Sequence, residues 1–133
     1  MTAPRRVGVI GLGIMGSAMS ANLVKAGFEV RGFDIVPARR AALKRAGGKP
    51  VSSLSGLKSD VVITSLPSAE ALHAVAAQLK HKCIVVETST LPIEEKVKAR
   101  DALKRKGITL LDCPLSGTGA QARCRSRAPR SRP

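Results

Sequence analysis

The sequence predicts an α/β domain built on a doubly wound parallel sheet. Short runs of β-branched and other apolar residues alternate with helical patterns almost from the first residue, and turn residues separate them at short intervals. Strands that alternate with helices at this spacing pair in parallel through right-handed crossovers. The chain has 133 residues, of which 44% are hydrophobic and 24% are charged. This size and composition are typical of one globular domain, and a typical two-domain enzyme does not fit them.

Each expected element has its own local pattern. The first helix, for example, carries an apolar stripe at Met15, Met19, Leu23 and Ala26, and it ends at Gly27. The expected strands are 6–10, 29–34, a short strand at Val51, 60–66, 83–87 and 108–112. The expected helices are 15–26, 37–46, 67–79 and 92–106. The strand order expected for such a chain is 3-2-1-4-5-6.

A glycine fingerprint, G-x-G-x-x-G, lies between the first strand and the first helix. It consists of Gly11, Leu12, Gly13, Ile14, Met15 and Gly16. Gly11 permits the tight turn, Gly13 lets a pyrophosphate approach the backbone, and Gly16 lets the helix pack close to the strand. The free N–H groups at the start of the helix then face the phosphates. In this context the spacing predicts a Rossmann dinucleotide-binding domain, with a glycine-rich turn of another α/β fold as the alternative.

An acidic residue, Asp34, lies at the carboxyl end of the expected second strand, 23 positions after Gly11. A carboxylate at this place accepts hydrogen bonds from the ribose hydroxyls of adenosine and repels a 2′-phosphate, so it favours NAD over NADP. Three nearby arginines, Arg31, Arg39 and Arg40, leave NADP possible, because an arginine can pair with a phosphate. The alternative for these arginines is a solvated helix face.

The charge of the chain is strongly basic but unevenly placed. Lys and Arg total 23 against 9 Asp and Glu, for a net charge of +14, and residues 123–133 hold five arginines and no acid. We expect this tail to be disordered and residues 1–122 to be the folded domain. The absence of Trp and Tyr excludes an aromatic platform for single-stranded nucleic acid. Binding to nucleic acid is therefore expected to be non-specific if it occurs.

The cysteines and histidines predict neither a disulfide scaffold nor a metal site. Cys83, Cys113 and Cys124 form no C-x-x-C pair, which favours a reducing compartment and a cytoplasmic location. His73 and His81 have no partners at ligand spacing. No apolar run approaches the roughly 20 residues of a membrane-spanning helix.

Four ordered segments carry a resemblance to a known family. They are VGVIGLGIMGSAMSANLVKAGFEV (7–30), DVVITSLPS (60–68), VVETST (85–90) and LLDCPLSGTGAQA (110–122). With these segments the chain resembles the β-hydroxyacid dehydrogenases, which include 3-hydroxyisobutyrate, tartronate-semialdehyde and threonate-type enzymes and are related to 6-phosphogluconate dehydrogenase. The resemblance implies oxidation of a small 3-hydroxy acid, or reduction of its semialdehyde, with NAD.

The resemblance also implies roles for residues beyond the glycine fingerprint. Leu66 and Pro67 correspond to a backbone contact with the cofactor ribose near the nicotinamide. Thr90 corresponds to a cofactor-contacting threonine, and the alternative for it is a helix cap ahead of Pro92.

Ser116 and Gly117 correspond to the family's substrate loop, whose hydroxyl and amides hold the substrate carboxylate. Thr118 stands where the family usually has a second glycine, so it is expected to narrow the pocket or to add a hydroxyl. The alternative for Ser116 is an ordinary turn serine.

The length of the chain is the largest departure from the family. Members of the family continue into a helical second domain, which carries a catalytic lysine and much of the dimer interface. No lysine of this chain matches that motif, so no catalytic residue is predicted and hydride transfer by this chain alone is not expected. We expect a truncated or frameshifted product, in which the face left by the missing domain favours self-association. The alternatives are a non-catalytic dinucleotide-binding or interaction module and a basic protein that binds nucleic acid through its tail.

Overall fold

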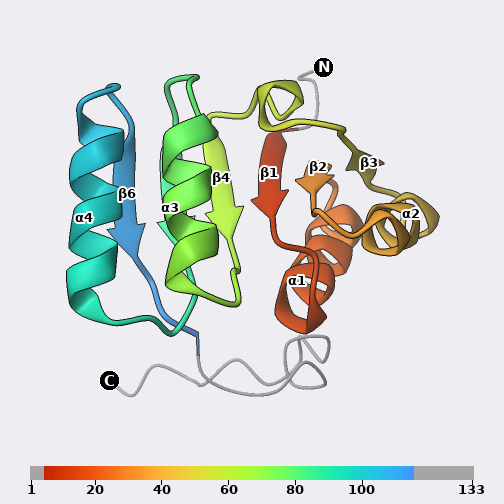
Figure 1. The fold of residues 1–133 in the computed structure, drawn as a ribbon. Coiled ribbons are helices and arrows are strands. Elements are labelled where there is room, and N and C mark those ends of the chain that lie inside the picture. Colours follow the sequence, from red (N-terminus) through yellow and green to blue (C-terminus); the bar gives the residue numbers. More distant parts are fainter. Residues whose placement is uncertain (1–4, 116–133) are drawn as a thin grey trace, which may run out of the picture.

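The computed structural model describes residues 5–115, which form a parallel sheet with helices on both faces (Figure 1). Its strands are β1 (Arg6–Ile10), β2 (Glu29–Phe33), β3 (Lys49–Pro50), β4 (Val61–Thr64), β5 (Ile84–Glu87) and β6 (Thr109–Asp112). Its helices are α1 (Ile14–Lys25), α2 (Pro37–Arg45), α3 (Ala69–Gln78) and α4 (Ile93–Lys104), with a short 3-10 turn at Leu54–Gly56. No helix in this part of the chain is long and apolar enough to cross a membrane.

The sheet has the topology that the sequence predicts. All pairings are parallel, and the strand order is β3-β2-β1-β4-β5-β6. After β3 the chain returns past β2 and β1 to form β4, so the winding direction reverses between β1 and β4. In such sheets a ligand binds in the crevice outside the carboxyl ends of the strands at this reversal. In Figure 1 these carboxyl ends point downward, and α1, α3 and α4 begin there.

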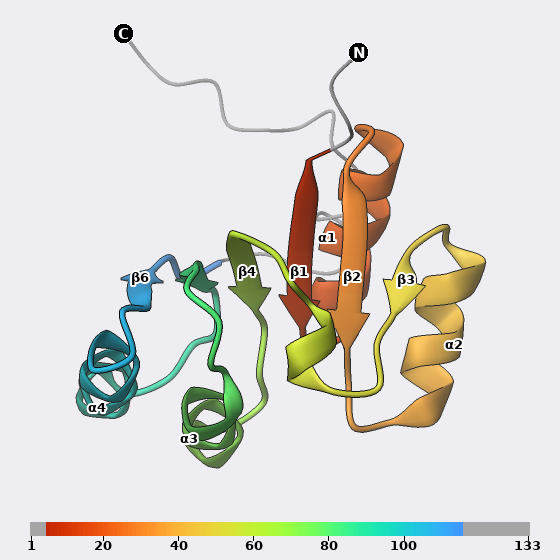
Figure 2. The same cartoon turned by 90° about the horizontal axis from the view of Figure 1, so that it is seen from above.

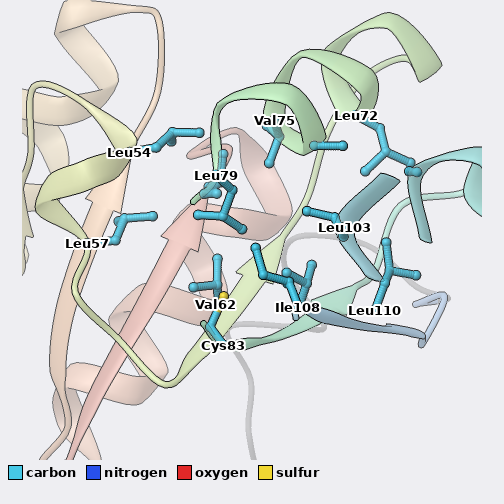
Figure 3. Close-up of a cluster of buried hydrophobic side chains, with 14 residues drawn as sticks. Leu54, Leu57, Val62, Leu72, Val75, Leu79, Cys83, Leu103, Ile108 and Leu110 are labelled. Atoms are coloured by element: carbon cyan, nitrogen blue, oxygen red, sulfur yellow. The ribbon is translucent and has the colours of Figure 1, made fainter. Parts of the chain in front are cut away.

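Two hydrophobic cores cover the two faces of the sheet. Helices α3 and α4 lie side by side on one face, and α1 lies on the other (Figure 2). The larger core fills the space beneath α3 and α4 and includes Val62, Val85, Leu72, Leu103 and Leu110 (Figure 3). The smaller core joins β1 and β2 to α1 and α2 through Val9, Leu12, Val30 and Leu43. Because the β1 residues Val9 and Ile10 enter different cores, both faces of this central strand are buried, as its apolar run predicts.

The third strand differs from the expectation in place and length. It covers Lys49–Pro50 rather than Val51, although the Val51 amide still donates to the Gly32 carbonyl at 2.9 Å. Pro50 has no N–H to donate, and β3 lies at the edge of the sheet, where a proline is tolerated. The 3-10 turn that follows, which the sequence pattern does not predict, places Leu54 in the larger core.

Candidate dinucleotide-binding site

Two glycines of the fingerprint are required by the packing of the chain itself. Gly11 has a φ of +93°, and a Cβ built on it would lie 2.0 Å from the Ser65 carbonyl oxygen. A Cβ on Gly16 would lie 1.8 Å from the Gly11 carbonyl oxygen. Both positions therefore exclude any side chain, because the turn after β1 lies against the segment that follows β4 at Gly11 and against the start of α1 at Gly16.

Gly13 is different, because no contact within residues 5–115 requires it to be glycine. Its φ is −71°, and the nearest heavy atom to a Cβ built there would be Arg39 Nη1 at 4.0 Å. No atom of the described part of the chain fills the space above its Cα. Packing within these residues therefore does not explain the missing side chain. A ligand lying against the backbone explains it, because such a ligand needs the space that a Cβ would fill.

The start of α1 has the features of an anion-binding helix N-terminus. Gly13 is the N-cap residue, no side chain caps the helix, and the first turn contains no acidic residue. The first intrahelical bond runs from the Ser17 amide to the Gly13 carbonyl at 2.9 Å. The amides of Ile14, Met15 and Gly16 precede it and have no intrahelical acceptor, so they and the positive end of the helix dipole can receive phosphate oxygens.

Asp34 is 6% exposed and fixes the glycine loop. Its Oδ2 accepts a hydrogen bond from the Leu12 amide at 2.8 Å, and its Oδ1 accepts one from the Val36 amide at 2.9 Å. The carboxylate thus ties the turn after β1 to the end of β2. Each carboxylate oxygen can accept more than one hydrogen bond, so these contacts leave capacity for ribose hydroxyls.

The three arginines near Asp34 have different partners. Arg39 is half exposed, and its Nη1 lies 3.5 Å from Asp34 Oδ2. Arg40 donates to the Asp34 carbonyl oxygen at 2.7 Å, and Arg31 donates to the Gly56 carbonyl at 3.0 Å. Arg39 alone among them lies close to both Asp34 and the position above Gly13.

A buried polar network follows β4 and β5. Glu87 is fully buried and accepts hydrogen bonds from the Thr64 hydroxyl and, at 2.6 Å, from the Ser89 amide. The Ser89 hydroxyl accepts from the Leu66 amide at 2.7 Å, and the Thr88 hydroxyl donates to the Thr64 carbonyl at 2.7 Å. The two segments after these strands are therefore held together side by side.

This network brings the predicted nicotinamide-side residues to the same edge of the sheet as the glycine loop. Leu66 is half-buried, and Pro67 and Thr90 are exposed. The N-cap residue of α4 is Pro92, with no side-chain cap bond, so the structure gives Thr90 no capping role.

The segment that leads toward the predicted substrate loop is also attached to this edge. The Cys113 amide donates to the Glu87 carbonyl at 2.8 Å, and the Leu115 amide donates to the Thr88 carbonyl at 3.3 Å. The predicted substrate residues Ser116, Gly117 and Thr118, and the basic tail, lie outside the described residues.

Within residues 5–115 no group of His, Cys, Asp and Glu side chains could hold a metal ion. His73 pairs instead with Glu95, and the hydrogen bond from His73 holds the pKa of the Glu95 carboxyl below its ordinary value. Cys83 is buried, and this burial raises the pKa of its thiol to about 11.

Sequence reasoning missed the buried residues that organise the site, above all Glu87, Ser89 and Lys96. A signal for Lys96 exists, because Lys96, Ala99 and Leu103 follow the spacing of one buried helix face. A lysine on an apolar stripe indicates a specific partner.

The strand order and the glycine loop define this molecule as a dinucleotide-binding domain of the Rossmann class. Its sequence matches the family described as the NAD binding domain of 6-phosphogluconate dehydrogenase over residues 6–126. The chain belongs to this family, as its resemblance to the β-hydroxyacid dehydrogenases indicates.

Individual relatives agree with this assignment. The chain is 34% identical to the L-threonate dehydrogenase of Cupriavidus necator in an alignment of 127 residues, and the match covers 89% of this chain and 43% of that protein. The solved structure of Mycobacterium tuberculosis 3-hydroxyisobutyrate dehydrogenase with L-serine superimposes with a TM-score of 0.83 at 31% identity, covering 91% of this chain and 44% of that one. A structure of Psf3 in complex with NADP+ and 2-OPP has a TM-score of 0.81 at 26% identity, covering 89% and 45%. The chain spans less than half the length of these relatives.

Proposed function

We propose that the chain binds NAD at the carboxyl edge of the sheet, in the crevice between β1 and β4, as the cofactor-binding part of an oxidoreductase. The observation that carries the proposal is Gly13, because no contact within residues 5–115 requires glycine there and the space that a Cβ would fill is free for a ligand. The proposed reaction acts on the CH–OH group of a small 3-hydroxy acid, in line with the relatives named for L-threonate and 3-hydroxyisobutyrate. NAD supplies the hydride acceptor in such chemistry.

The adenosine half of the cofactor is proposed to lie over the glycine loop. The pyrophosphate would contact the backbone from Gly11 to Gly16 (Gly11, Leu12, Gly13, Ile14, Met15 and Gly16), and the adenosine ribose would donate to Asp34. A buried carboxylate repels a 2′-phosphate, so we propose a preference for NAD. Arg39, which is half exposed beside that carboxylate, is the side chain available to offset this repulsion when NADP binds.

The nicotinamide half is proposed to lie toward β4 and β5. Leu66 and Pro67 would contact the adjoining ribose, and Thr90 would contact the cofactor. Ser116, Gly117 and Thr118 are proposed to receive the carboxylate of the hydroxy acid. These residues directly follow Leu115, the last residue that the structure describes. The Leu115 amide donates a hydrogen bond to the carbonyl of Thr88, which follows β5.

Calorimetric titration of the chain with NAD, NADP and duplex DNA tests this proposal. We expect binding of NAD, weaker binding of NADP and no specific binding of DNA; any DNA binding that occurs should be non-specific and sensitive to salt. Replacing Gly13 by valine should abolish NAD binding without unfolding the chain. NADP binding tighter than NAD would contradict the cofactor preference, and no binding of either nucleotide would remove the function.

We also propose a cytoplasmic location and self-association. The described cysteines, Cys83 and Cys113, are free thiols, which suits a reducing compartment. Ile84 and Leu111 are 43% and 47% exposed, and by strand register they lie on the face of β5 and β6 turned away from α3 and α4. Light scattering tests this association, because L111K should lower the measured mass if that face is the contact.

A further inference from the structure

Lys96, in the first turns of α4, is a buried charged residue that the proposed function does not use. Its side chain is 7% exposed. Its Nζ donates to the Ser89 carbonyl oxygen at 2.6 Å and to Asp112 Oδ1 at 2.5 Å. These two acceptors come from different strand ends, since Ser89 follows β5 and Asp112 ends β6.

The position of Lys96 is unfavourable for a lysine. It is the fourth residue of α4, where the helix dipole is positive and repels a cation. Burying an ammonium group carries a desolvation penalty that an apolar side chain of similar size avoids. Lys96 also lies on the buried helix face shared with Ala99 and Leu103, where a methionine would fill the same space. Filling space in the core therefore does not by itself account for a lysine at this position.

The two contacts of Lys96 fix the backbone beside the proposed nicotinamide site. Ser89 accepts from the Leu66 amide through its hydroxyl and from Lys96 through its carbonyl. The peptide between Ser89 and Thr90 is thus held from two sides. Asp112 is the last residue of β6 and begins the segment that leads to Ser116.

The contacts do not reach the adenosine half of the proposed site. Gly13 and Asp34 follow β1 and β2, whereas Lys96 acts on the ends of β5 and β6, and β4 lies between these two pairs of strands. Figure 1 shows this separation along the lower edge of the sheet, with α4 and β6 at one end and α1 and α2 toward the other.

We propose that Lys96 is a positioning residue, which holds the Ser89–Thr90 peptide and Asp112 in the geometry that receives the nicotinamide half of the cofactor and the adjoining substrate. The inference rests on the proposed function. In this role Lys96 strengthens the binding of whole NAD and leaves the binding of its adenosine and pyrophosphate part unaffected.

The test compares NAD with ADP, which contains the adenosine and pyrophosphate but no nicotinamide riboside. In Lys96→Met we expect NAD affinity to fall roughly three- to tenfold, the cost of ordering one or two further groups on binding. ADP affinity should stay within about twofold, although the melting temperature should fall, because the Ser89 carbonyl oxygen and Asp112 lose their common donor. The matched control is Lys98→Met, which removes the same charge from an exposed position on the same helix and should alter neither affinity.

A second variant covers the case in which Lys96→Met does not fold. Asp112→Asn changes a half-exposed side chain and weakens only one of the two contacts, so it should fold and lower NAD affinity by a smaller factor, again without affecting ADP. Equal losses for NAD and ADP, or no loss of NAD affinity in either variant, would overturn the inference. If the parent chain binds neither nucleotide, the proposed function itself has failed, and that outcome is recognised before any variant is compared.

Discussion

Replacing Gly13 and Gly16 separately by alanine should separate binding from folding within one short motif. The same methyl group is added in each case, three residues apart in sequence. At Gly16 it would lie 1.8 Å from the Gly11 carbonyl oxygen and 2.9 Å from the carbonyl carbon, so the backbone of the turn must move. At Gly13 its nearest neighbour would be Nη1 of Arg39 at 4.0 Å, and the side chain of Arg39 is half exposed.

The expected magnitudes follow from these contacts. Overpacking against backbone typically costs about 1–3 kcal/mol or more, and we expect Gly16→Ala at or above the upper end because the clash involves backbone on both sides. Gly13→Ala places alanine at a helix N-cap without a clash, which costs at most about 1 kcal/mol. For a domain of this size, 1 kcal/mol corresponds to roughly 3–6 °C in melting temperature.

The loss of NAD affinity, unlike the loss of stability, should be caused by the substitution at Gly13. A methyl on Gly13 occupies the space in which we place the pyrophosphate, so Gly13→Ala should weaken NAD binding by about tenfold or more, equivalent to about 1.4 kcal/mol. Thermal unfolding and calorimetric titration of both variants measure the two quantities. A Gly13→Ala chain that binds NAD like the parent, or that loses as much stability as Gly16→Ala, would refute this interpretation of the loop.

Three further predictions concern charged groups and thiols. Asp34→Ala should narrow the difference in affinity between NAD and NADP, and it should also destabilise the chain by about 1–3 kcal/mol because two backbone amides lose their acceptor; an unchanged affinity ratio would contradict the proposed ribose contact. Hydrogen bonding, from Lys49 first, lowers the pKa of Glu29 to about 2. The stabilisation from this carboxylate should therefore be complete above about pH 4.5 and be lost as the pH falls toward 2, so Glu29→Gln should flatten the acid limb of a pH–stability curve. Burial raises the pKa of the Cys83 thiol to about 11, so an alkylating reagent at neutral pH should label the exposed Cys113 well before Cys83, as peptide mass mapping would show.

Much of the fold could be predicted because its determinants are local. A pattern of only a few residues predicts the conformation of the apolar runs at 6–10 and 83–87 and of the glycine loop. The parallel strand order follows from the alternation of such strands with helices. The short third strand was less predictable, because Lys49–Pro50 pairs only with β2 at the sheet edge and has little apolar pattern of its own.

The candidate site was predictable where a motif carries it and hidden where long-range contacts form it. The spacing of Gly11 and Asp34 predicts a cofactor contact, but it does not show that Asp34 also holds the Leu12 amide. From the sequence, Glu87 is an ordinary polar residue at the end of an apolar strand, although in the structure it is fully buried between Thr64 and Ser89. Such roles depend on partners more than 20 residues away or on the loop that follows, and local patterns do not encode them.

The central claim, that NAD lies across the carboxyl edge of the sheet over Gly13, is tested most directly by amide NMR of the labelled chain during titration with NAD. We predict that the largest shifts fall on the amides of residues 12–16 and, with smaller size, on Leu66 and Thr90. The amides at the opposite edge of the sheet, such as Glu29 and Lys49 at the starts of β2 and β3, should not move. Shifts confined to that opposite edge, or no shifts at saturating NAD, would contradict the proposed site.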